Sequence, residues 1–147
     1  MKSIHTTVLL NETIDGLNLK PHSVVIDGTF GGGGHSALIC QKFPNVKIIA
    51  FDQDAGAFIK AQDKFQGLKC DITFVNGNFR HLQDLEKFSA FTPGDLGQGA
   101  HGSQNFPNLV DAIILDLGLS SDQLENSGRG FSFMKDEPLL MTMKENP

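Results

Sequence analysis

The chain alternates between short apolar runs and longer segments whose apolar residues recur every three or four positions. The apolar runs, rich in Val, Ile and Phe, predict buried strands at residues 23–28, 47–54, 71–79 and 110–118. The segments with helical spacing predict helices at residues 8–21, 34–43, 55–65 and 79–88. Strands that alternate with helices pair in parallel through right-handed crossovers. The pattern therefore predicts an α/β, doubly wound fold around a mostly parallel sheet.

The length of 147 residues suits one domain, residues 1–147, with a substantial core. One stretch, residues 91–108, is rich in Gly, Pro, Ser and Asn and separates the fourth expected helix, 79–88, from the fourth expected strand. A segment of this composition and length predicts a flexible loop, either a tolerated insertion or a functional lid.

Charge and cysteine usage narrow the class of protein. The net charge is −5, from 12 Lys and Arg against 17 Asp and Glu, which argues against a surface that grips nucleic acid everywhere but leaves room for a local basic patch. Cys40 and Cys70 form no C-x-x-C pair, so we expect two reduced cysteines near the core.

The five histidines are scattered without metal-ligand spacing, and we expect no metal. The N-terminal apolar run is too short for a signal peptide, and no stretch reaches the length of a membrane span, so we expect a soluble cytoplasmic protein.

Four consecutive glycines, Gly31 to Gly34, stand between the first expected strand and its helix. Glycine is costly in ordered backbone unless the chain must bend sharply or approach a ligand closely. In an open parallel sheet, ligands bind at the carboxyl ends of the strands. The residues expected at or just beyond those ends are Asp27, Asp52, Asn78, Phe79 and Asp116.

Each of these residues has a role to offer a nucleotide-like ligand. The glycines would let the backbone approach it, and the start of the following helix would favour an anionic group. Asp52, about 20 residues further on, stands where an acidic residue accepts hydrogen bonds from ribose hydroxyls. Phe79 would either stack on adenine or belong to the core, and His35 would either contact the ligand or be held by packing.

Two cofactor classes fit the glycine loop. Residues 32–37, GGGHSA, satisfy the G-x-G-x-x-A fingerprint of dinucleotide binding, although a run of glycines satisfies many patterns. A P-loop is excluded because no Gly-Lys-Ser/Thr follows. Asp27, ahead of the glycines, would repel a pyrophosphate but favour a cationic ligand. That carboxylate tilts the choice from NAD towards S-adenosylmethionine, which carries an ammonium and a sulfonium and no phosphate.

The segment 115–141 combines Arg129 with Phe131 and Phe133. A basic residue beside aromatic rings can hold a phosphate and stack a base. The alternative is a turn-rich loop whose phenylalanines dock on the core.

Five motifs in order, HTTVLLNETIDGL, DGTFGGGGHS, DQD, DLGLSSDQL and RGFSF, resemble the bacterial 16S ribosomal RNA cytosine-N4 methyltransferase family, the RsmH or MraW type. The resemblance spans nearly the whole chain, from His5 to Met143. It implies a Rossmann-like class I methyltransferase fold, S-adenosylmethionine as methyl donor, and the N4 amino group of a cytidine in the decoding region of the small ribosomal subunit as acceptor. Matched motif by motif, the implied donor contacts are Gly33, Gly34, His35, Asp52, Phe79, Asp116 and Gln123.

For the transfer itself, Asp116 or a backbone carbonyl beside it is the candidate acceptor for an N4 hydrogen. Orientation of the two reactants would contribute several kcal/mol to lowering the barrier. Because the base must leave its stack to be reached, Phe131 and Phe133 are candidates to receive it, with Arg129 beside them.

The sequence departs from the family pattern in three places. Thr7 replaces a usual Pro, and residues 138–144, PLLMTMK, replace a stretch that usually reads P-L-D-M-R-M-D, with changes at Leu140, Thr142 and Lys144. Family members also continue with an inserted helical domain and further strands. We therefore expect a domain incomplete on its C-terminal side, whose exposed sheet edge is covered by a second copy or by the missing half. Alternatives to the enzyme are a non-catalytic donor-binding or partner-binding domain and an NAD-binding oxidoreductase domain.

Overall fold

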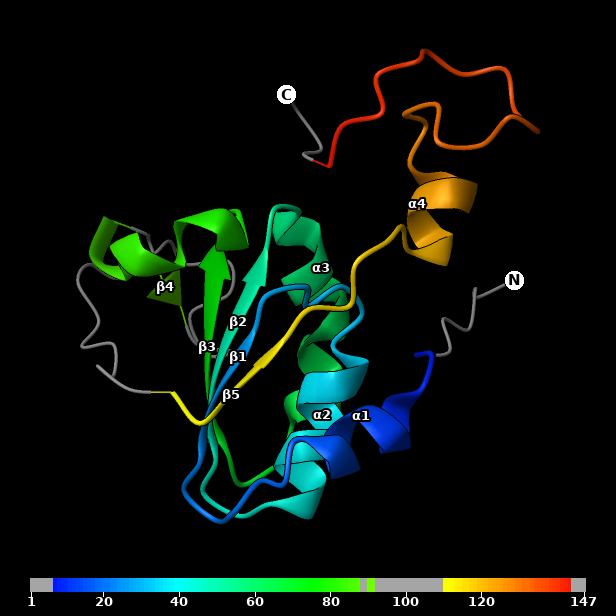
Figure 1. The fold of residues 1–147 in the computed structure, drawn as a ribbon. Helices are drawn as coiled ribbons and strands as arrows, with labels where there is room; N and C mark the ends of the chain where they lie inside the picture. Colours follow the sequence, from blue (N-terminus) through cyan, green and yellow to red (C-terminus); the bar gives the residue numbers. More distant parts are fainter. Residues whose placement is uncertain (1–6, 88–89, 92–109, 144–147) are drawn as a thin grey trace.

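The computed structural model describes residues 7–87, 90–91 and 110–143, which form a sheet covered by helices (Figure 1). In chain order the strands are β1 Val24–Asp27, β2 Lys47–Asp52, β3 Asp71–Asn76, β4 Ala90–Phe91 and β5 Ala112–Ile114. They lie side by side in the order β4-β3-β2-β1-β5. The pairs β3–β2, β2–β1 and β1–β5 are parallel, and β4 runs antiparallel to β3. The prediction of an α/β fold with a mostly parallel sheet is confirmed.

The helices of the described residues are α1 Leu10–Gly16, α2 Gly34–Lys42, α3 Ala55–Ala61 and α4 Ser121–Asn126, with 3-10 segments η1 Gln62–Phe65 and η2 Phe79–Lys87. Three of the expected helices are therefore shorter or tighter than predicted. The first ends at Gly16 rather than near Pro21, because Asn18 adopts a left-handed backbone (φ 50°) that turns the chain. The third continues as η1, and the fourth is η2, a 3-10 segment throughout.

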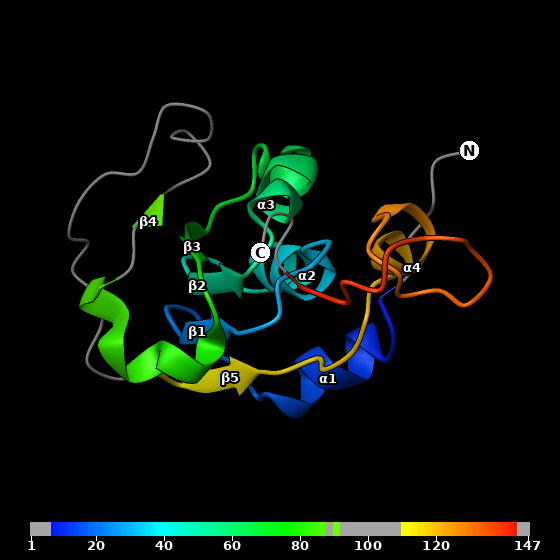
Figure 2. The ribbon, with the colours of Figure 1, turned by 90° about the horizontal axis from the view of Figure 1, so that it is seen from above.

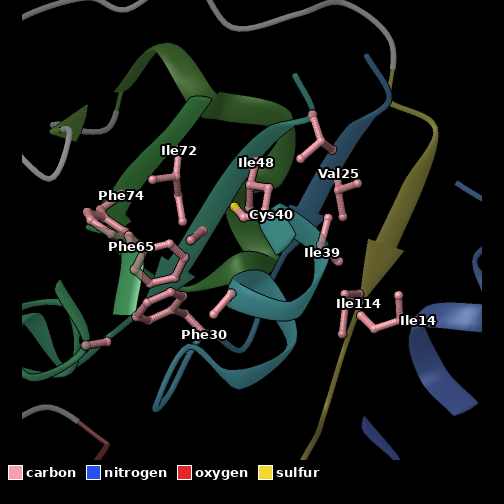
Figure 3. Packing of buried hydrophobic residues seen from close by; sticks show 14 of the residues in the cluster. Ile14, Val25, Phe30, Ile39, Cys40, Ile48, Phe65, Ile72, Phe74 and Ile114 are labelled. Carbon is pink, nitrogen blue, oxygen red and sulfur yellow. The ribbon is translucent and has the colours of Figure 1, made fainter. Parts of the chain in front are cut away.

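One face of the sheet carries the main core. Alternate strand residues such as Val25, Ile48 and Ile114 point to the same face, where Ile14 of α1 and Ile39 of α2 cover them (Figure 3). All five are at most 4% exposed. This packing orients α1 and α2 against the sheet.

An aromatic cluster extends the same core towards α3. The ring of Phe30 lies 5.2 Å from that of Phe58 and 5.3 Å from that of Phe74, and Phe65 stacks on it at 5.9 Å. Figure 3 shows Phe30, Phe65 and Phe74 gathered at one end of the core. Since Phe30 precedes the glycine run, this cluster holds the start of that loop on the core.

The opposite face of the sheet has a smaller cluster of Ile26, Ile49, Phe51 and Val75, against which Phe79 and Leu82 of η2 pack. Segments therefore cover both faces, as doubly wound folds require.

Strand β5 lies at the edge of the described sheet. Two apolar side chains here are open to solvent: Ile113 within the strand is 47% exposed, and Leu115 directly after it is 48% exposed. Strand β5 is shorter than the expected strand 110–118. Strand β4 falls at the start of the expected loop 91–108; the rest of that loop lies outside the described residues. No helix in the described ranges is long and apolar enough to cross a bilayer.

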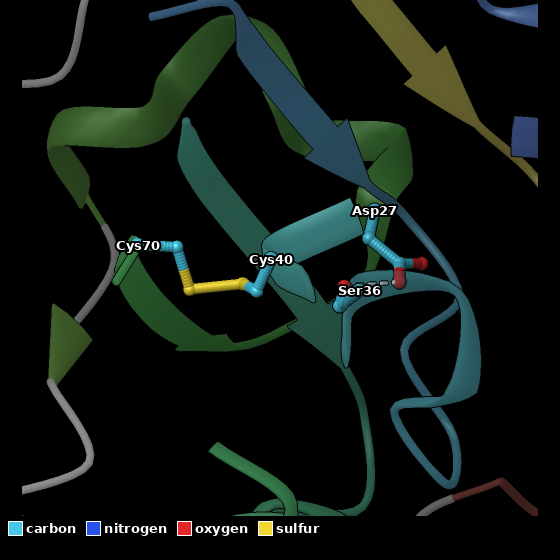
Figure 4. Close-up of a disulfide and its surroundings, with 4 residues drawn as sticks. All are labelled: Asp27, Ser36, Cys40 and Cys70. Carbon is cyan, nitrogen blue, oxygen red and sulfur yellow. Dashed lines mark hydrogen bonds between the residues drawn. A yellow bond between two sulfur atoms is a disulfide. The ribbon is translucent and has the colours of Figure 1, made fainter. Parts of the chain in front are cut away.

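The expectation of two reduced cysteines is wrong. Cys40 in α2 and Cys70, just before β3, form a disulfide whose Cα atoms lie 5.3 Å apart (Figure 4). They are 30 residues apart in sequence, and the crossover from α2 through β2 and α3 brings them together. A pairing made by topology leaves no local spacing motif, which is why the sequence pattern did not show it.

Candidate functional site

A cavity of about 410 Å³ opens where the parallel strands end. Figure 2 looks down on these carboxyl ends, with the loop into α2 and the segment that leads to α4 on either side. The loop after β1, the ends of β2 and β3, the start of α3 and the stretch 116–123 all contribute to its wall. The sequence-predicted residues among its lining are Gly31, Gly32, Gly34, His35, Asp52, Asn78, Phe79, Asp116 and Gln123. Gly33, also predicted, is not part of the lining.

The glycine loop needs glycine for two separate reasons. Gly31 and Gly33 have positive φ angles of 50° and 70°, which side chains disfavour. A Cβ on Gly33 would also stand 2.7 Å from the ring of Phe30, and one on Gly34 would collide with the side chain of Thr7. Gly33 is the N-cap of α2, so the first N–H groups of that helix begin at the loop. Thr7, the departure from the family pattern, thus lies against the loop and lines the cavity.

Asp52 fixes the loop from the neighbouring strand. Its Oδ2 accepts a hydrogen bond from the backbone N–H of Gly31 at 2.7 Å, and its Oδ1 accepts one from that of Asp54 at 2.9 Å. Burial raises the pKa of the Asp52 carboxyl, while these backbone hydrogen bonds act in the opposite direction. One carboxylate therefore ties the end of β2 to both the glycine loop and the start of α3.

Asp27 lies beneath the loop rather than in the cavity. It is 1% exposed, accepts from Ser36 Oγ at 2.7 Å and from the N–H of Thr29 at 3.2 Å, and is absent from the cavity lining (Figure 4). Burial raises its pKa above the ordinary value. The sequence predicts that this carboxylate repels a pyrophosphate and favours a cationic ligand; in the structure it faces Ser36 and Thr29 and supports the loop from below.

His35 has one ring nitrogen without a partner. The residue is 5% exposed, and Nε2 has no hydrogen-bond partner within the described part of the chain. His35 lines both the main cavity and a smaller one of about 220 Å³ between α1 and β5. A buried polar atom without a partner is costly, so Nε2 is available for a ligand.

On the β5 side, Asp116 and Gln123 come from irregular backbone and from α4. The N–H of Asp116 donates to Thr29 Oγ1 at 2.7 Å, while its side chain is exposed and lines the cavity. Gln123 forms a capping box with Ser120, and its Nε2 lies 3.4 Å from the sulfur of Met143. The sequence reading placed no helix here, although Ser-x-x-Gln is the signature of such a cap.

Phe79 lies at the boundary between the core and the cavity. It packs on the smaller core cluster and also lines the cavity. Position alone therefore makes it part of the core and a wall of the cavity at the same time.

The three residues proposed to receive RNA lie outside the cavity lining. Arg129 is 6% exposed, with its guanidinium bonded to carbonyl oxygens, and its carbon Cζ lies 5.7 Å from the centre of the Phe131 ring. Phe133 is 97% exposed. The structure thus separates a buried arginine from an exposed phenylalanine four residues further on.

Sequence reasoning missed several residues of the cavity wall. Lys64 reaches back to the glycine loop, where its Nζ donates to the carbonyl of Gly32 at 2.6 Å. Asp54 and Met143 also line the cavity. Asp54 belongs to the DQD motif but was not singled out, whereas only contacts between distant segments reveal Lys64 and Met143.

Comparison with known proteins places the chain in a family. Residues 2–147 match the MraW methylase family. The chain is 39% identical over 142 residues to ribosomal RNA small subunit methyltransferase H of Brevibacillus brevis, which covers 96% of this chain and 40% of the relative. It is 38% identical over 143 residues to ribosomal RNA small subunit methyltransferase H 1 of Acholeplasma laidlawii, covering 97% and 42% respectively.

The chain thus spans about two fifths of the length of these curated relatives. Among solved structures, an rRNA methylase from Streptococcus thermophilus overlaps 55% of this chain and 49% of its own, with a TM-score of 0.45 and 21% identity. The family match covers nearly every residue, including the glycine loop, the strand ends and the segment around Arg129. The chain belongs to the MraW methylase family.

Proposed function

We propose that the chain binds S-adenosylmethionine in the 410 Å³ cavity and forms the donor-binding part of an enzyme that methylates a ribosomal RNA. The acceptor is the N4 amino group of a cytidine in the decoding region of the small ribosomal subunit. Membership of a methylase family supports the donor. The relatives, named as small subunit ribosomal RNA methyltransferases, support the acceptor. We propose a cytoplasmic location, because the proposed substrate is ribosomal RNA.

The observation that carries the proposal is the loop held between Asp52 and α2, with an unpartnered histidine nitrogen beside it. A Cβ at Gly33 would meet the Phe30 ring and one at Gly34 would meet Thr7, so only glycine allows the loop this shape. In this shape the backbone of Gly31, Gly32 and Gly34 lines the cavity, where a ligand can approach it. His35 Nε2 offers a buried polar contact. These features fit a ligand that lies along the loop and needs close main-chain contact.

Within this proposal Asp52 accepts hydrogen bonds from the ribose hydroxyls, because each of its oxygens has a further lone pair beyond the backbone bonds it already accepts. Phe79 packs on the adenine from the end of β3. Gln123 closes the opposite wall, with its Nε2 facing only the weak acceptor of Met143.

When bound, the donor supplies an electrophilic methyl group on a sulfonium. The cytosine N4 would attack that carbon in line, the electron pair of the carbon–sulfur bond would leave with sulfur, and the N4 proton would pass to the Asp116 carboxylate. We propose that the Asp116 carboxylate accepts a hydrogen bond from an N–H of the N4 amino group. This bond localises the N4 lone pair as attack begins. The carboxylate is open to the cavity, and the hydrogen bond that holds Asp116 uses only its backbone N–H.

Phe133, with its ring in solvent, is the proposed stacking partner for an extruded base. Arg129 and Phe131 precede it by four and two residues in the sequence. The exposed edge of β5 is proposed to be covered by a second copy or by further chain of the same protein.

A methyl-transfer assay tests the function. Small ribosomal subunits that lack the modification are incubated with the chain and isotopically labelled donor, and the digested RNA is analysed by mass spectrometry for N4-methylcytidine. Labelled N4-methylcytidine is the expected product. Binding of donor without any product would contradict the catalytic part and favour a donor-binding domain without turnover.

A further inference from the structure

Residues 129–143 contain no helix or strand, yet they lie on the side of the molecule where the parallel strands end. Figure 2 shows this segment leaving α4 and running back across α2 towards α3. At its far end, Met143 lines the main cavity beside Gln123. We refer to residues 129–143 as the strap.

Apolar packing contributes little to holding the strap. Its large apolar side chains are mostly in solvent, namely Phe133 at 97%, Leu139 at 83%, Met134 at 79%, Met141 at 59% and Leu140 at 51%. Because burial of apolar area is the usual source of stability, a segment this exposed needs polar anchors to keep one position.

Arg129 supplies those anchors from one end of the strap to the other. Its Nη1 donates to the carbonyl oxygens of Thr142 at 3.0 Å and Met143 at 2.8 Å, and the N–H of Met141 donates to the carbonyl of Arg129 at 2.8 Å. The guanidinium fork thus closes the strap into a loop. The contacts are to backbone, so the family departures at Leu140 and Thr142 leave them intact.

The same guanidinium faces the other wall of the cavity. Arg129 Nη2 lies 3.9 Å from Oδ2 of Asp54, whose Oδ1 caps α3 by accepting from Gly56 N–H. Asp54 in turn donates its N–H to Asp52. A buried charge is retained only where it is paired. The Arg129 guanidinium therefore links the strap to the wall of the cavity that carries the Asp52 carboxylate.

Glycine at position 130 lets the strap fold this closely. Gly130 has a φ of 75°, and a Cβ there would collide with the carbonyl oxygen of Pro138. Its N–H donates to Glu137 at 3.0 Å. Arg129 therefore anchors the end of the strap, and the turn at Gly130 brings the two ends of the strap close enough for that contact.

We infer that the strap closes the donor cavity, with Met143 as its contact to the ligand and Arg129 as the positioning residue that holds it in place. This inference rests on the proposed donor binding. Arg129 acts through the backbone of Thr142 and Met143 and touches no ligand itself. Its loss frees the strap, so a bound donor dissociates faster.

The test compares Arg129→Met with Arg80→Met, a change at the only other arginine, which is exposed and outside the strap. S-adenosylhomocysteine affinity and dissociation rate are measured together with backbone hydrogen exchange. Arg129→Met should weaken binding by at least about tenfold, as loss of charge-assisted hydrogen bonds predicts, through faster dissociation. Exchange should rise in residues 130–143 and stay unchanged in β1 and β2. Arg80→Met should bind as the unchanged chain does.

Two further variants keep the test independent of folding. Arg129→Lys retains the charge without the fork and should restore part of the affinity. Met143→Ala shortens the cavity wall while leaving Arg129 in place, and should weaken binding without raising exchange in the strap. Unchanged affinity in both Arg129→Met and Met143→Ala would overturn the inference while leaving the proposed function standing.

If the unchanged chain fails to bind S-adenosylhomocysteine, the proposed function and the closure of a donor cavity both fail, and hydrogen exchange decides only whether Arg129 anchors the strap. Loss of strap protection in Arg129→Met would still support Arg129 as the anchor. Identical exchange in both chains would overturn it.

Discussion

Asp52, the last residue of β2, and Gly31, in the loop between β1 and α2, are joined by a 2.7 Å hydrogen bond from the glycine N–H to the carboxylate. Gly31 adopts a φ of 50° that few other residues tolerate. The bond thus fixes a strained loop against the end of β2. Preorganisation of this kind reduces the ordering cost of binding, because the loop already has the shape that a ligand needs.

Gly33→Ala should weaken S-adenosylhomocysteine binding by about tenfold or more, since the new Cβ meets the Phe30 ring and shifts the loop. Gly67→Ala is the matched control, because Gly67 has a similar φ of 76° but open space around it. Both changes should cost about 1–2 kcal/mol of stability from backbone strain. Only Gly33→Ala should alter binding in calorimetric titration. Equal affinities for the two variants would contradict the role of the loop.

Asp27→Asn should change how stability depends on pH. Burial raises the folded-state pKa of Asp27 above its ordinary 3.8, so the folded chain binds that proton more tightly than the unfolded chain. Its contribution to the free energy of unfolding is full below the ordinary pKa and is lost as pH rises through the folded-state pKa. An asparagine can accept from Thr29 N–H and donate to Ser36 Oγ without carrying a charge.

The stability of the Asp27→Asn variant relative to the unchanged chain should therefore rise as the pH is raised above the ordinary carboxyl pKa of 3.8 and through the higher folded-state pKa. Denaturant unfolding at several pH values measures this difference. Asp71→Asn, an exposed carboxylate at the opposite end of the sheet, provides the control. Parallel stability curves for Asp27→Asn and the unchanged chain would refute the burial argument.

Breaking the disulfide should destabilise the fold and leave the cavity intact. Cys40 and Cys70 close a segment with a sequence separation of 30, for which the chain-entropy account predicts a loss of about 3–4 kcal/mol. Neither residue lines the cavity, because Cys70 precedes β3 at the end of the sheet opposite the glycine loop. The double variant Cys40→Ser, Cys70→Ser should unfold at lower denaturant concentration yet bind S-adenosylhomocysteine normally. A large loss of affinity in the folded variant would show coupling that the structure does not explain.

Asp116→Ala should abolish methyl transfer while S-adenosylhomocysteine binding persists. The proposed task of its carboxylate is to accept from the amino group in the transition state, and loss of one such contact costs about a hundredfold or more in turnover. Transfer to small ribosomal subunits and calorimetry, run on the same preparation, separate the two effects. Turnover equal to that of the unchanged chain would remove Asp116 from the chemistry.

The sequence predicted the parts of the fold that local patterns encode. Runs of β-branched residues located β1 to β3, and the glycines located the turn before α2, because burial and backbone freedom are properties of single residues and their neighbours. The strand ends at Asp27 and Asp52 followed from the same runs. The cavity wall was therefore largely predictable on the side formed by the glycine loop, β2 and β3.

What the sequence did not predict depends on contacts between distant segments. The Cys40–Cys70 disulfide joins positions brought together only by the crossover. Arg129 resembles a phosphate-binding residue in sequence, whereas in the fold its fork is occupied by the carbonyls of Thr142 and Met143. Asp27 looked like a ligand contact because it follows a strand, yet its direction is set by Ser36 on α2.

Calorimetric titration with S-adenosylhomocysteine, with NAD as the control ligand, tests the central claim most directly. The account predicts binding of the former alone, and at least about a tenfold loss in Asp52→Asn, which cannot keep both oxygens as acceptors for Gly31 and Asp54 N–H groups and a ribose. Asp71→Asn should bind as the unchanged chain does. Binding of NAD instead, or no binding by a folded chain, would contradict the claim that this glycine loop holds a methyl donor.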